Sequence, residues 1–371
     1  MKKILITGAY GFIGRNLVAT LERDEELELL KYGSKHSMEQ LIEYATQADF
    51  VFHLAGVNRP ERVEEFREGN LEFTRHLLHA LGDSPKKPPI VFASSIQAEQ
   101  DNAYGESKYG AEKLILSYSK NNQVPVYIFR LPNVFGKWSR PNYNSVIATW
   151  CYNIARNIPI QVNNPQTYVN LVYIDDVIQQ FAQVMKELPN VDNDPYVTLP
   201  QLFNVSLGQI EANLRAFKDS RKTLMLPNLN NEFDKYLYST YLSYLPTDDF
   251  GYELEMKTDQ RGWLAEFIKT ESAGQIFISR TKPGITRGNH WHHTKVEKFL
   301  VIEGEAVIRF RHIETEEVVE YQVSGTRVQV VDIPPGFTHS ITNIGTSDVI
   351  TLFWANERFD PQKPDTYFLE V

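Results

Sequence analysis

The chain has 371 residues, of which 42% are hydrophobic and 23% are charged, which excludes a disordered or fibrous protein and describes an ordinary globular one. This length is too great for one typical hydrophobic core, so we expect two domains. The formal net charge of −9 leaves no surplus of cations to neutralise phosphates, which argues against a nucleic-acid partner.

The single cysteine and the hydropathy of the chain indicate where the protein resides. Cys151 has no second cysteine with which to form an intrachain disulfide, which suits a reducing compartment. The first residues, MKKILITGAYGFIG, imitate a signal peptide, but glycines interrupt their apolar run and Arg15 follows directly. No run of eighteen or more apolar residues occurs elsewhere, so we expect no membrane insertion and a cytoplasmic protein.

The pattern of predicted secondary structure changes near residue 247. Before that point, short apolar runs alternate with segments of helical length, which predicts βαβ units and a Rossmann-type, doubly wound parallel sheet over residues 1–247. The strand candidates there are ILIT, FVFHLA, IVFAS and VYIFRL. Over residues 248–371, strands such as QIFISR, KFLVIEG and EAVIRFR follow one another with short turns. That pattern predicts an antiparallel all-β sandwich or barrel.

A glycine-rich turn follows the first predicted strand. In ILITGAYGFIG, Gly8, Gly11 and Gly14 lie between that strand and a helix. Small residues let the backbone approach a pyrophosphate, and the helix N-terminus offers free N–H donors. We therefore expect this turn, including Phe12 and Ile13, to bind a dinucleotide; the alternative is a tight turn that serves only helix–sheet packing.

The end of the second predicted strand, ELELLKYGSKHS, bears on the choice of cofactor. An NAD site normally has an acidic residue there to bind the ribose 2′-hydroxyl, whereas this sequence supplies Ser34, Lys35 and His36. Hydroxyl and cationic groups suit a 2′-phosphate, and Arg15 can assist, so we predict NADPH. The alternative is that these are solvated loop residues and that Glu28 binds the ribose.

A tyrosine and a lysine four residues apart form the candidate catalytic pair. Tyr104 and Lys108 follow two adjacent serines, Ser94 and Ser95, at the end of a predicted strand. In a helix, residues four apart share a face, so the phenol and the ammonium can meet one cofactor. We expect the ammonium to lower the tyrosine pKa from its ordinary value of about 10, which would permit proton transfer near pH 7.

These motifs together resemble one family. TGAYGFIG, DFVFHLAG, the paired serines, YGESK and FRLPNVFG are similar to the extended short-chain dehydrogenase/reductase family that acts on nucleotide sugars, most clearly over residues 1–180. The resemblance implies that Tyr104 is the acid–base residue, that Lys108 holds the nicotinamide ribose, and that Ser95, or alternatively Ser94, contacts the substrate carbonyl. It also implies that six further residues line the cofactor cleft: Leu54, Ala55, Gly56, Pro132, Asn133 and Val134.

Two departures from this family concern the substrate side of the site. The loop after the paired serines is short, and YVNLVYIDDV lacks the arginine–aspartate pair that is common in sugar-nucleotide epimerases. Asp175 and Asp176 can simply cap a helix. For the phosphates of a UDP group, Lys137, Arg140 and Arg156 are candidates by their position alone.

A second constellation lies in the C-terminal part. GITRGNHWHHTKVEKFLVIEG and PPGFTHSITN contain His290, His292, Glu297 and His339. On a strand, His290 and His292 project to one face because the side-chain period is two. Glu297 and His339 on other strands can then complete a metal shell of three nitrogens and one oxygen. Such a shell suits zinc, iron, manganese or nickel; we expect zinc. Surface histidines grouped by chance are the alternative.

This constellation resembles the double motif of cupins. Its first half matches throughout, and its second half matches at Pro334, Gly336, His339 and Asn343, although Val328 replaces the leading glycine. DQRGWLAEF and WANERFDPQKPDTYF are similar to the cupin-fold 3,5-epimerases of nucleotide-linked 4-keto-6-deoxy sugars. The resemblance implies an epimerase-like jelly roll over residues 248–371, in which the metal either acts as an electrophile or holds the barrel together.

A reductase followed by such a cupin resembles the bifunctional enzymes of capsular polysaccharide precursor synthesis. This resemblance implies a UDP-linked 4-keto-6-deoxy amino sugar, UDP-2-acetamido-2,6-dideoxy-4-hexulose, as substrate. The cupin would invert C3, and the reductase would reduce C4 with NADPH to UDP-2-acetamido-2,6-dideoxy-L-talose, on the route to UDP-N-acetyl-L-fucosamine. Two alternatives are an NAD-retaining epimerase or dehydratase with a structural cupin cap, and a non-catalytic NADP-sensing protein. Exposed edges of a small barrel favour a homodimer.

Overall fold

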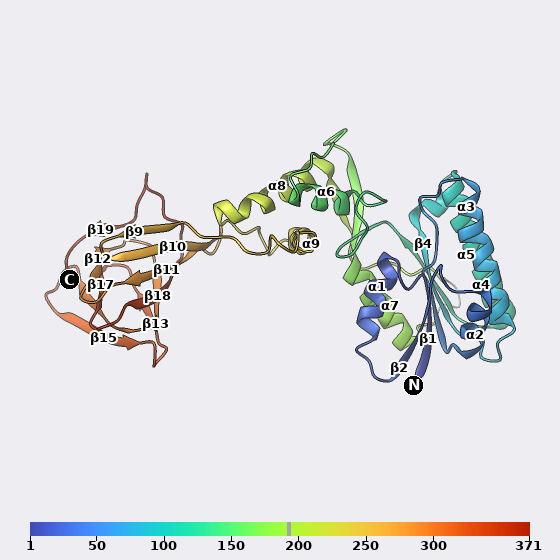
Figure 1. Ribbon diagram of the computed structural model, residues 1–371, viewed down its shortest axis with the longest axis horizontal. Helices are drawn as coiled ribbons and strands as arrows, with labels where there is room; N and C mark the ends of the chain where they lie inside the picture. The colour runs from blue at the N-terminus through green and yellow to red at the C-terminus, as the bar shows by residue number, and fades with distance from the viewer. Residues whose placement is uncertain (191–193) are drawn as a thin grey trace. The chain divides into compact units, whose positions relative to one another are not determined.

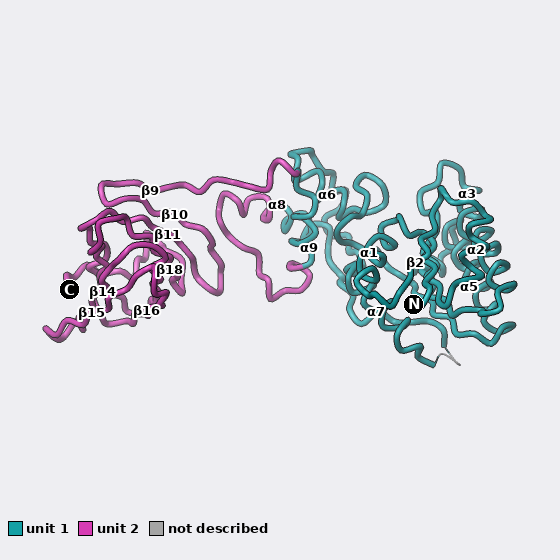
Figure 2. Tube along the Cα trace, turned by 60° about the horizontal axis from the view of Figure 1, so that its bottom comes forward, with its two compact units in different colours: residues 1–214, 236–246 teal, residues 215–235, 247–371 magenta. Residues whose placement is uncertain are grey.

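The computed structural model describes residues 1–190 and 194–371, which form two compact units (Figure 2). Unit 1 comprises residues 1–214 and 236–246, and unit 2 comprises residues 215–235 and 247–371. The boundary expected from the sequence, between residues 247 and 248, does not take account of the 215–235 stretch, which clusters with unit 2. Within the described parts of the chain, no helix is both long enough and apolar enough to span a bilayer.

Unit 1 is built on a five-stranded parallel sheet with the order β2-β1-β3-β4-β5. Its strands are β1 (Lys2–Thr7), β2 (Leu27–Tyr32), β3 (Phe50–His53), β4 (Ile90–Ser95) and β5 (Val126–Leu131). β3 and β4 are buried along their whole length, which explains why they read as continuous apolar runs. β2 and β3 lie on opposite sides of β1. A ligand crevice is therefore expected at the carboxyl ends of β1 and β3.

Helices cover both faces of this sheet (Figure 1). One face carries α1 (Phe12–Leu21) and α7 (Ile174–Glu187); the other carries α2 (Met38–Gln47), α4 (Phe73–Gly82) and α5 (Ala103–Asn122). The shorter helices are α3 (Glu64–Phe66), the π-helical η1 (Arg67–Glu72) and the 3₁₀ turn η2 (Ile96–Glu99). α3 and η1 precede α4 in the chain, and η2 connects β4 to α5. All three therefore border the carboxyl edge of the sheet.

The rest of unit 1 follows β5 in the chain. A small sheet pairs β6 (Asn133–Phe135) in parallel with β7 (Tyr168–Tyr173), and β7 antiparallel with β8 (Phe203–Ser206). The helices of this part of the chain are α6 (Val146–Ala155), α8 (Leu207–Thr223) and α9 (Glu232–Leu242). Residues 207–214 of α8 and 236–242 of α9 belong to unit 1, and the rest of both helices belongs to unit 2. α6 buries Cys151, and burial raises the pKa of its thiol, so the cysteine packs as a small apolar residue.

Unit 2 is an antiparallel sandwich of two sheets with the orders β16-β13-β18-β11-β10-β9 and β15-β14-β17-β12-β19. The strands are β9 (Met256–Asp259), β10 (Gly262–Lys269), β11 (Gln275–Thr281), β12 (Thr286–Trp291), β13 (Glu297–Glu303), β14 (Glu305–His312), β15 (Val318–Ser324), β16 (Val330–Ile333), β17 (Phe337–Asn343), β18 (Val349–Ala355) and β19 (Tyr367–Phe368). Buried side chains from both sheets, including Phe299, Phe310 and Phe353, form its core. The predicted fold class, a Rossmann-type sheet followed by an all-β jelly roll, is confirmed.

Candidate functional site

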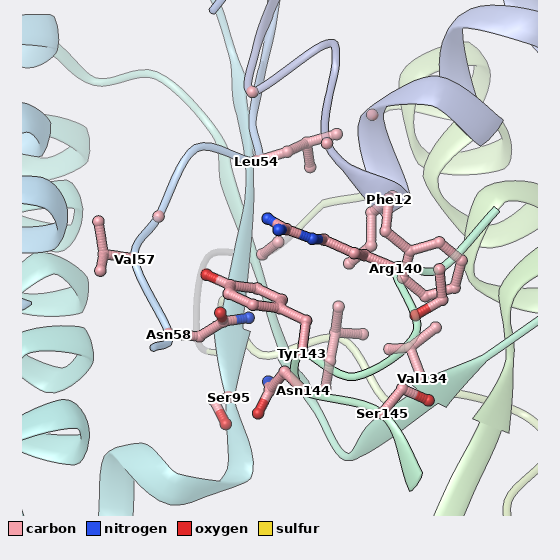
Figure 3. Close-up of a pocket in the computed structure, with 18 of the residues that line it drawn as sticks. Phe12, Leu54, Val57, Asn58, Ser95, Val134, Arg140, Tyr143, Asn144 and Ser145 are labelled. Atoms are coloured by element: carbon pink, nitrogen blue, oxygen red, sulfur yellow. The ribbon is translucent and has the colours of Figure 1, made fainter. Parts of the chain in front are cut away.

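A cleft of about 1620 Å³ opens in unit 1 at the carboxyl ends of the parallel strands (Figure 3). The turn after β1, the loop after β3, the end of β4, the start of α5 and the segment after β5 all contribute to its walls. Among the described residues that line it there is no Asp or Glu, whereas four are cationic: Arg15, Lys108, Arg140 and Arg156. The electrostatics of the cleft therefore favour an anionic ligand.

The turn after β1 has the geometry of a pyrophosphate cradle. Gly8 has a φ of +71°, and a Cβ atom there would lie 2.7 Å from the backbone nitrogen of Ala55. A Cβ on Gly14 would lie 2.1 Å from the carbonyl oxygen of Gly8. Gly11 occupies the N-cap of α1 without a side chain to cap it, which leaves N–H donors at the helix start for a ligand. The predicted residues of this turn all line the cleft: Gly8, Gly11, Phe12, Ile13, Gly14 and Arg15.

The segment after β2 contributes to the cleft only two of the three residues that were expected to bind a 2′-phosphate. Ser34 and His36 line the cleft, but Lys35 is exposed and does not line it. Glu28, the alternative ribose-binding residue, lies within β2 and pairs with Lys3 at 3.3 Å instead of lining the cleft. The end of the cleft expected to hold the adenosine ribose therefore offers hydroxyl and imidazole groups without a carboxylate.

The candidate catalytic residues meet at one place in the cleft. Tyr104 and Lys108 both line it from the first turns of α5, and Ser95 forms a hydrogen bond with the Tyr104 phenol. The Lys108 Nζ donates a hydrogen bond of 2.7 Å to the carbonyl oxygen of Ala93. The loop residues Leu54, Ala55, Gly56, Pro132, Asn133 and Val134 line the same cleft.

The expectation for the tyrosine pKa was wrong in direction. Burial raises the pKa of Tyr104, and the hydrogen bond from Ser95 opposes this only in part. Lys108 is itself buried, and burial lowers the pKa of its ammonium to about 8 while Glu112 acts in the opposite direction. The phenol is therefore held in its protonated form, which is the form that can donate a proton.

The two adjacent serines have different partners. The Ser94 hydroxyl donates a hydrogen bond of 2.5 Å to the carboxylate of Glu112. Glu112 is fully buried and forms a bidentate pair with Arg130, with distances of 3.0 Å from Nε and 2.7 Å from Nη2. Ser94 is thus committed to a buried network, whereas Ser95 lies beside Tyr104. This geometry favours Ser95 as the group that contacts a substrate carbonyl.

Two residues that support the site, Glu112 and Asn70, were not predicted from the sequence. Asn70 is buried in the π-helical η1, a type of distortion that is frequent at functional sites. Its side chain accepts a hydrogen bond from the backbone nitrogen of Val57 (2.8 Å) and donates to the Ser107 hydroxyl (2.9 Å). It therefore joins the loop after β3 to the catalytic helix. The four-residue spacing from Lys108 to Glu112 was a usable signal, but no spacing marks Asn70.

Two of the three cations proposed for phosphates line the cleft. Arg140 and Tyr143 project into it from the segment after β6 (Figure 3), and the Arg140 guanidinium lies 5.2 Å from the centre of the Tyr143 ring. Arg156 also lines the cleft, and its Nη1 donates a hydrogen bond of 2.7 Å to the carbonyl oxygen of Tyr244. Two guanidinium groups can thus meet the anionic part of a ligand.

The third cation, Lys137, does not line the cleft. Its Nζ lies 2.5 Å from the carboxylate of Asp175 in the first turn of α7. The N-cap of that helix is Tyr173, so Asp175 and Asp176 lie inside the first turn and not at the cap. Their negative charges still interact favourably with the helix dipole.

In unit 2, four potential metal ligands converge as predicted from their spacing. One ligand atom from each of His290, His292, Glu297 and His339 lies within 4.8 Å of the others. The Nε2 atoms of His292 and His339 each lie 3.5 Å from Oε2 of Glu297. Both Nε2 atoms are buried without a hydrogen-bond partner among the described residues. Because buried polar atoms are normally satisfied, this donor set fits a divalent metal.

The charges of this cluster are strongly perturbed. Burial would raise the pKa of Glu297, but the adjacent His292 and His339 imidazoles outweigh burial and hold that pKa well below its usual range. Burial, assisted by the neighbouring histidines, lowers the pKa of His290 to about 4. At neutral pH the cluster therefore presents a carboxylate and a neutral His290 imidazole, which are the forms that bind a metal.

The expected alternation of His290 and His292 on one strand is only partly observed. His290 lies on β12, which is irregular between Gly288 and His290, and His292 lies beyond the end of the strand. The two rings are nevertheless 5.0 Å apart. Period-two alternation therefore does not explain how His292 reaches the cluster; contacts outside the strand must direct it.

Together these features define a dinucleotide-binding protein of Rossmann type that carries a jelly roll with a cluster suited to a metal. The chain belongs to the NAD dependent epimerase/dehydratase family, whose model matches residues 4–204. Residues 257–367 match the Polysaccharide biosynthesis C-terminal domain.

Individual relatives extend over the whole chain. The chain is 46% identical over 369 residues to a UDP-2-acetamido-2,6-beta-L-arabino-hexul-4-ose reductase of Pseudomonas aeruginosa, which covers 100% of this chain and 99% of that protein. It is 51% identical to the crystal structure of the capsular polysaccharide assembling protein CapF from Staphylococcus aureus, with a TM-score of 0.93 over 99% of this chain and 100% of that one. A UDP-glucuronic acid 4-epimerase from Bacillus cereus in complex with NAD has a TM-score of 0.52 and 20% identity over 58% of this chain and 83% of that one, which shows a shared fold alone.

Proposed function

We propose that the chain is a bifunctional sugar-nucleotide enzyme of capsular polysaccharide precursor synthesis. Unit 1 reduces the C4 ketone of a UDP-2-acetamido-2,6-dideoxy-4-hexulose with NADPH, and unit 2 epimerises C3, so that the product is UDP-2-acetamido-2,6-dideoxy-L-talose. One observation carries the proposal: Ser95, Tyr104 and Lys108 meet in a cationic cleft of a chain that resembles a UDP-hexulose reductase throughout its length.

The cleft supports ketone reduction by proton donation from Tyr104. NADPH, when bound, supplies the hydride that is added to C4. Ser95 orients the ketone oxygen, and the protonated Tyr104 donates its proton to that oxygen as it becomes an alkoxide, so that hydride and proton together give the alcohol. Lys108 is mostly an ammonium at pH 7 because its pKa is about 8, and its charge stabilises the negative charge that develops beside it.

The choice of NADPH is supported by the charge of the cleft. Arg15, Ser34 and His36 line it, and no carboxylate is found among its described lining residues. Guanidinium, hydroxyl and imidazole groups can bind a 2′-phosphate, whereas the carboxylate that typically binds a free 2′-hydroxyl is missing there. We expect kcat/KM to be higher with NADPH than with NADH; equal values would contradict this part of the proposal.

The cluster of unit 2 supports chemistry at a carbon next to a ketone. His290, His292, Glu297 and His339 would hold a divalent ion, for which zinc is the candidate. When bound, the metal would supply either an electrophile that stabilises an enolate or a cross-link between strands of the sandwich. Inversion at C3 requires removal of the proton that the adjacent ketone acidifies.

Proton NMR of the UDP-linked 4-keto sugar in heavy water tests both activities. We expect deuterium to enter at C3 without NADPH, and C4 to be reduced once NADPH is added. As a matched control, Tyr104→Phe should lose the reduction and keep the C3 exchange. Reduction without C3 exchange would leave the reductase and overturn the epimerase, whereas a substrate that elicits no NADPH oxidation would overturn the reductase.

We also propose that the chain forms a homodimer. The edge strand β15 exposes Val318, Val319 and Tyr321, and an apolar edge strand readily pairs with another chain. Light scattering should give the mass of a dimer, and a monomeric mass at micromolar concentration would contradict this.

A further inference from the structure

The C-terminal segment, residues 365–369, runs along the strand that carries the first cluster histidine. β19 pairs antiparallel with β12, which places Phe368 opposite His290. The backbone nitrogen of Leu369 donates a hydrogen bond of 3.0 Å to the carbonyl oxygen of Asn289. This end of the chain is therefore attached directly to the strand that leads into the cluster.

Within this segment, the Asp365 carboxylate binds the turn that joins β12 to β13. Its Oδ1 accepts a hydrogen bond from the backbone nitrogen of His293 (2.9 Å), and its Oδ2 accepts from the backbone nitrogens of Thr294 (2.7 Å) and Lys295 (2.9 Å). The Thr294 hydroxyl is a fourth donor, at 3.0 Å. Three successive N–H groups that follow His292 thus converge on one side chain.

The backbone of Asp365 contacts a cluster member directly. Its carbonyl oxygen lies 2.5 Å from Nδ1 of His292, across 73 positions in the sequence. A carbonyl oxygen only accepts hydrogen bonds, so Nδ1 carries the imidazole proton. The unprotonated Nε2 then points toward Glu297 and His339, which is the orientation that a metal ligand requires.

We propose that Asp365 is a positioning residue of the metal cluster. Its carbonyl oxygen sets the tautomer and ring orientation of His292, and its carboxylate fixes the turn that carries this histidine out of β12. The inference rests on the metal site of the proposed function and names a residue that supports it from outside the ligand set. Loss of such outer support typically weakens metal binding by about 10–100-fold.

Metal titration of the full chain tests this role. The protein is stripped with a chelator and titrated with Zn²⁺ in the presence of a competing indicator dye. We expect Asp365→Ala to bind Zn²⁺ about 10–100-fold more weakly than the unchanged chain. Asp360→Ala is the matched control, because Asp360 lies five residues before Asp365 and its carboxylate accepts from the backbone nitrogen of Gln362 at 2.8 Å without contacting the cluster.

Circular dichroism separates positioning from folding. The affinities are compared at a temperature at which the metal-free variants are fully folded; Asp365→Asn, which keeps one acceptor oxygen, replaces Asp365→Ala should the latter not fold. Two results would overturn the role of Asp365 and leave the metal site in place. One is equal Zn²⁺ affinity for Asp365→Ala and the unchanged chain, and the other is a loss of Zn²⁺ affinity that appears only as unit 2 unfolds. Failure of the unchanged chain to bind a divalent ion at this cluster would overturn the metal site as well.

Discussion

The cleft of unit 1 and the metal cluster of unit 2 are held together in different ways. The cleft is formed by backbone turns at the ends of parallel strands, and two of its polar side chains are fixed by adjacent elements: Ser94 donates to Glu112 of α5, and Lys108 donates to the Ala93 carbonyl of β4. The cluster gathers side chains from β12, β13, β17 and the turn after β12, and His292 in that turn contacts the backbone of Asp365 near the C-terminus. A site at strand ends can thus be recognised from local motifs, whereas a site across a sandwich depends on contacts between distant segments.

Removing the proton donor should have the largest effect and should be confined to the cleft. We expect Tyr104→Phe to lower kcat for ketone reduction by about 10²–10⁴-fold, because the phenylalanine cannot protonate the alkoxide. Zn²⁺ affinity should remain unchanged. The measurement is NADPH oxidation under saturating substrate, beside a metal titration; a variant with full activity would show that another group supplies the proton.

The buried ion pair below the cleft should be the next most sensitive feature. Glu112→Gln removes the buried carboxylate that pairs with Arg130 and leaves that guanidinium only its pair with the exposed Glu99. Breaking a buried pair in this way typically costs about 3–5 kcal/mol. The half-exposed pair of Lys137 and Asp175 is the matched control, and Asp175→Asn should cost no more than about 1 kcal/mol. Urea unfolding monitored on the transition of unit 1 gives both values, and equal losses for the two variants would contradict the distinction.

The stability of unit 1 should depend on pH through a buried histidine. His53 lies between Thr7 and Thr74, with hydrogen bonds of 2.8 Å to each, and burial, with a smaller contribution from Lys108, lowers its pKa from 6.5 to about 3. The unfolded chain therefore binds this proton at a higher pH than the folded one. The stabilisation is complete above pH 6.5 and falls as the pH drops toward 3, by about 3 kcal/mol at pH 4.

Unfolding free energies at pH 7 and pH 4 measure this dependence. His53→Gln should show a smaller decrease between the two pH values than the unchanged chain does. His79→Gln, at an exposed position, should leave the decrease as it is. An identical pH dependence in all three proteins would show that His53 is not responsible.

The smallest expected effect concerns Asn343, which should support the stability of unit 2 without supporting its metal affinity. Asn343 is buried and donates to the carbonyl oxygens of Thr281 and Ser347, both at 2.9 Å, while Gly345 donates to its side chain. Asn343→Ala should destabilise unit 2 by about 1–3 kcal/mol, because it leaves the buried carbonyl oxygen of Thr281 without this donor. Unlike Asp365→Ala, it should leave Zn²⁺ affinity unchanged in the folded protein; thermal unfolding and metal titration together test this contrast.

Local patterns in the sequence determined the fold class and most of the candidate site. Glycines after a strand, as in the turn that begins at Gly8, are needed wherever a backbone must approach a ligand or its neighbour closely. Residues four apart on a helix, such as Tyr104 and Lys108, share a face. Alternating apolar residues indicate a two-sided strand. Each of these rules depends on geometry within a few residues, so it can be read before the chain is folded.

The tertiary structure decided what depends on contacts between distant segments. It separated Ser95 from Ser94 through the Glu112 carboxylate, which is contributed by another element. It reversed the expected pKa shift of Tyr104, because burial outweighs the hydrogen bond from Ser95, and burial is a property of the whole fold. It also brought Asp365 to His292 across 73 positions. Such pairings arise only when the chain is folded, and no local spacing contains them.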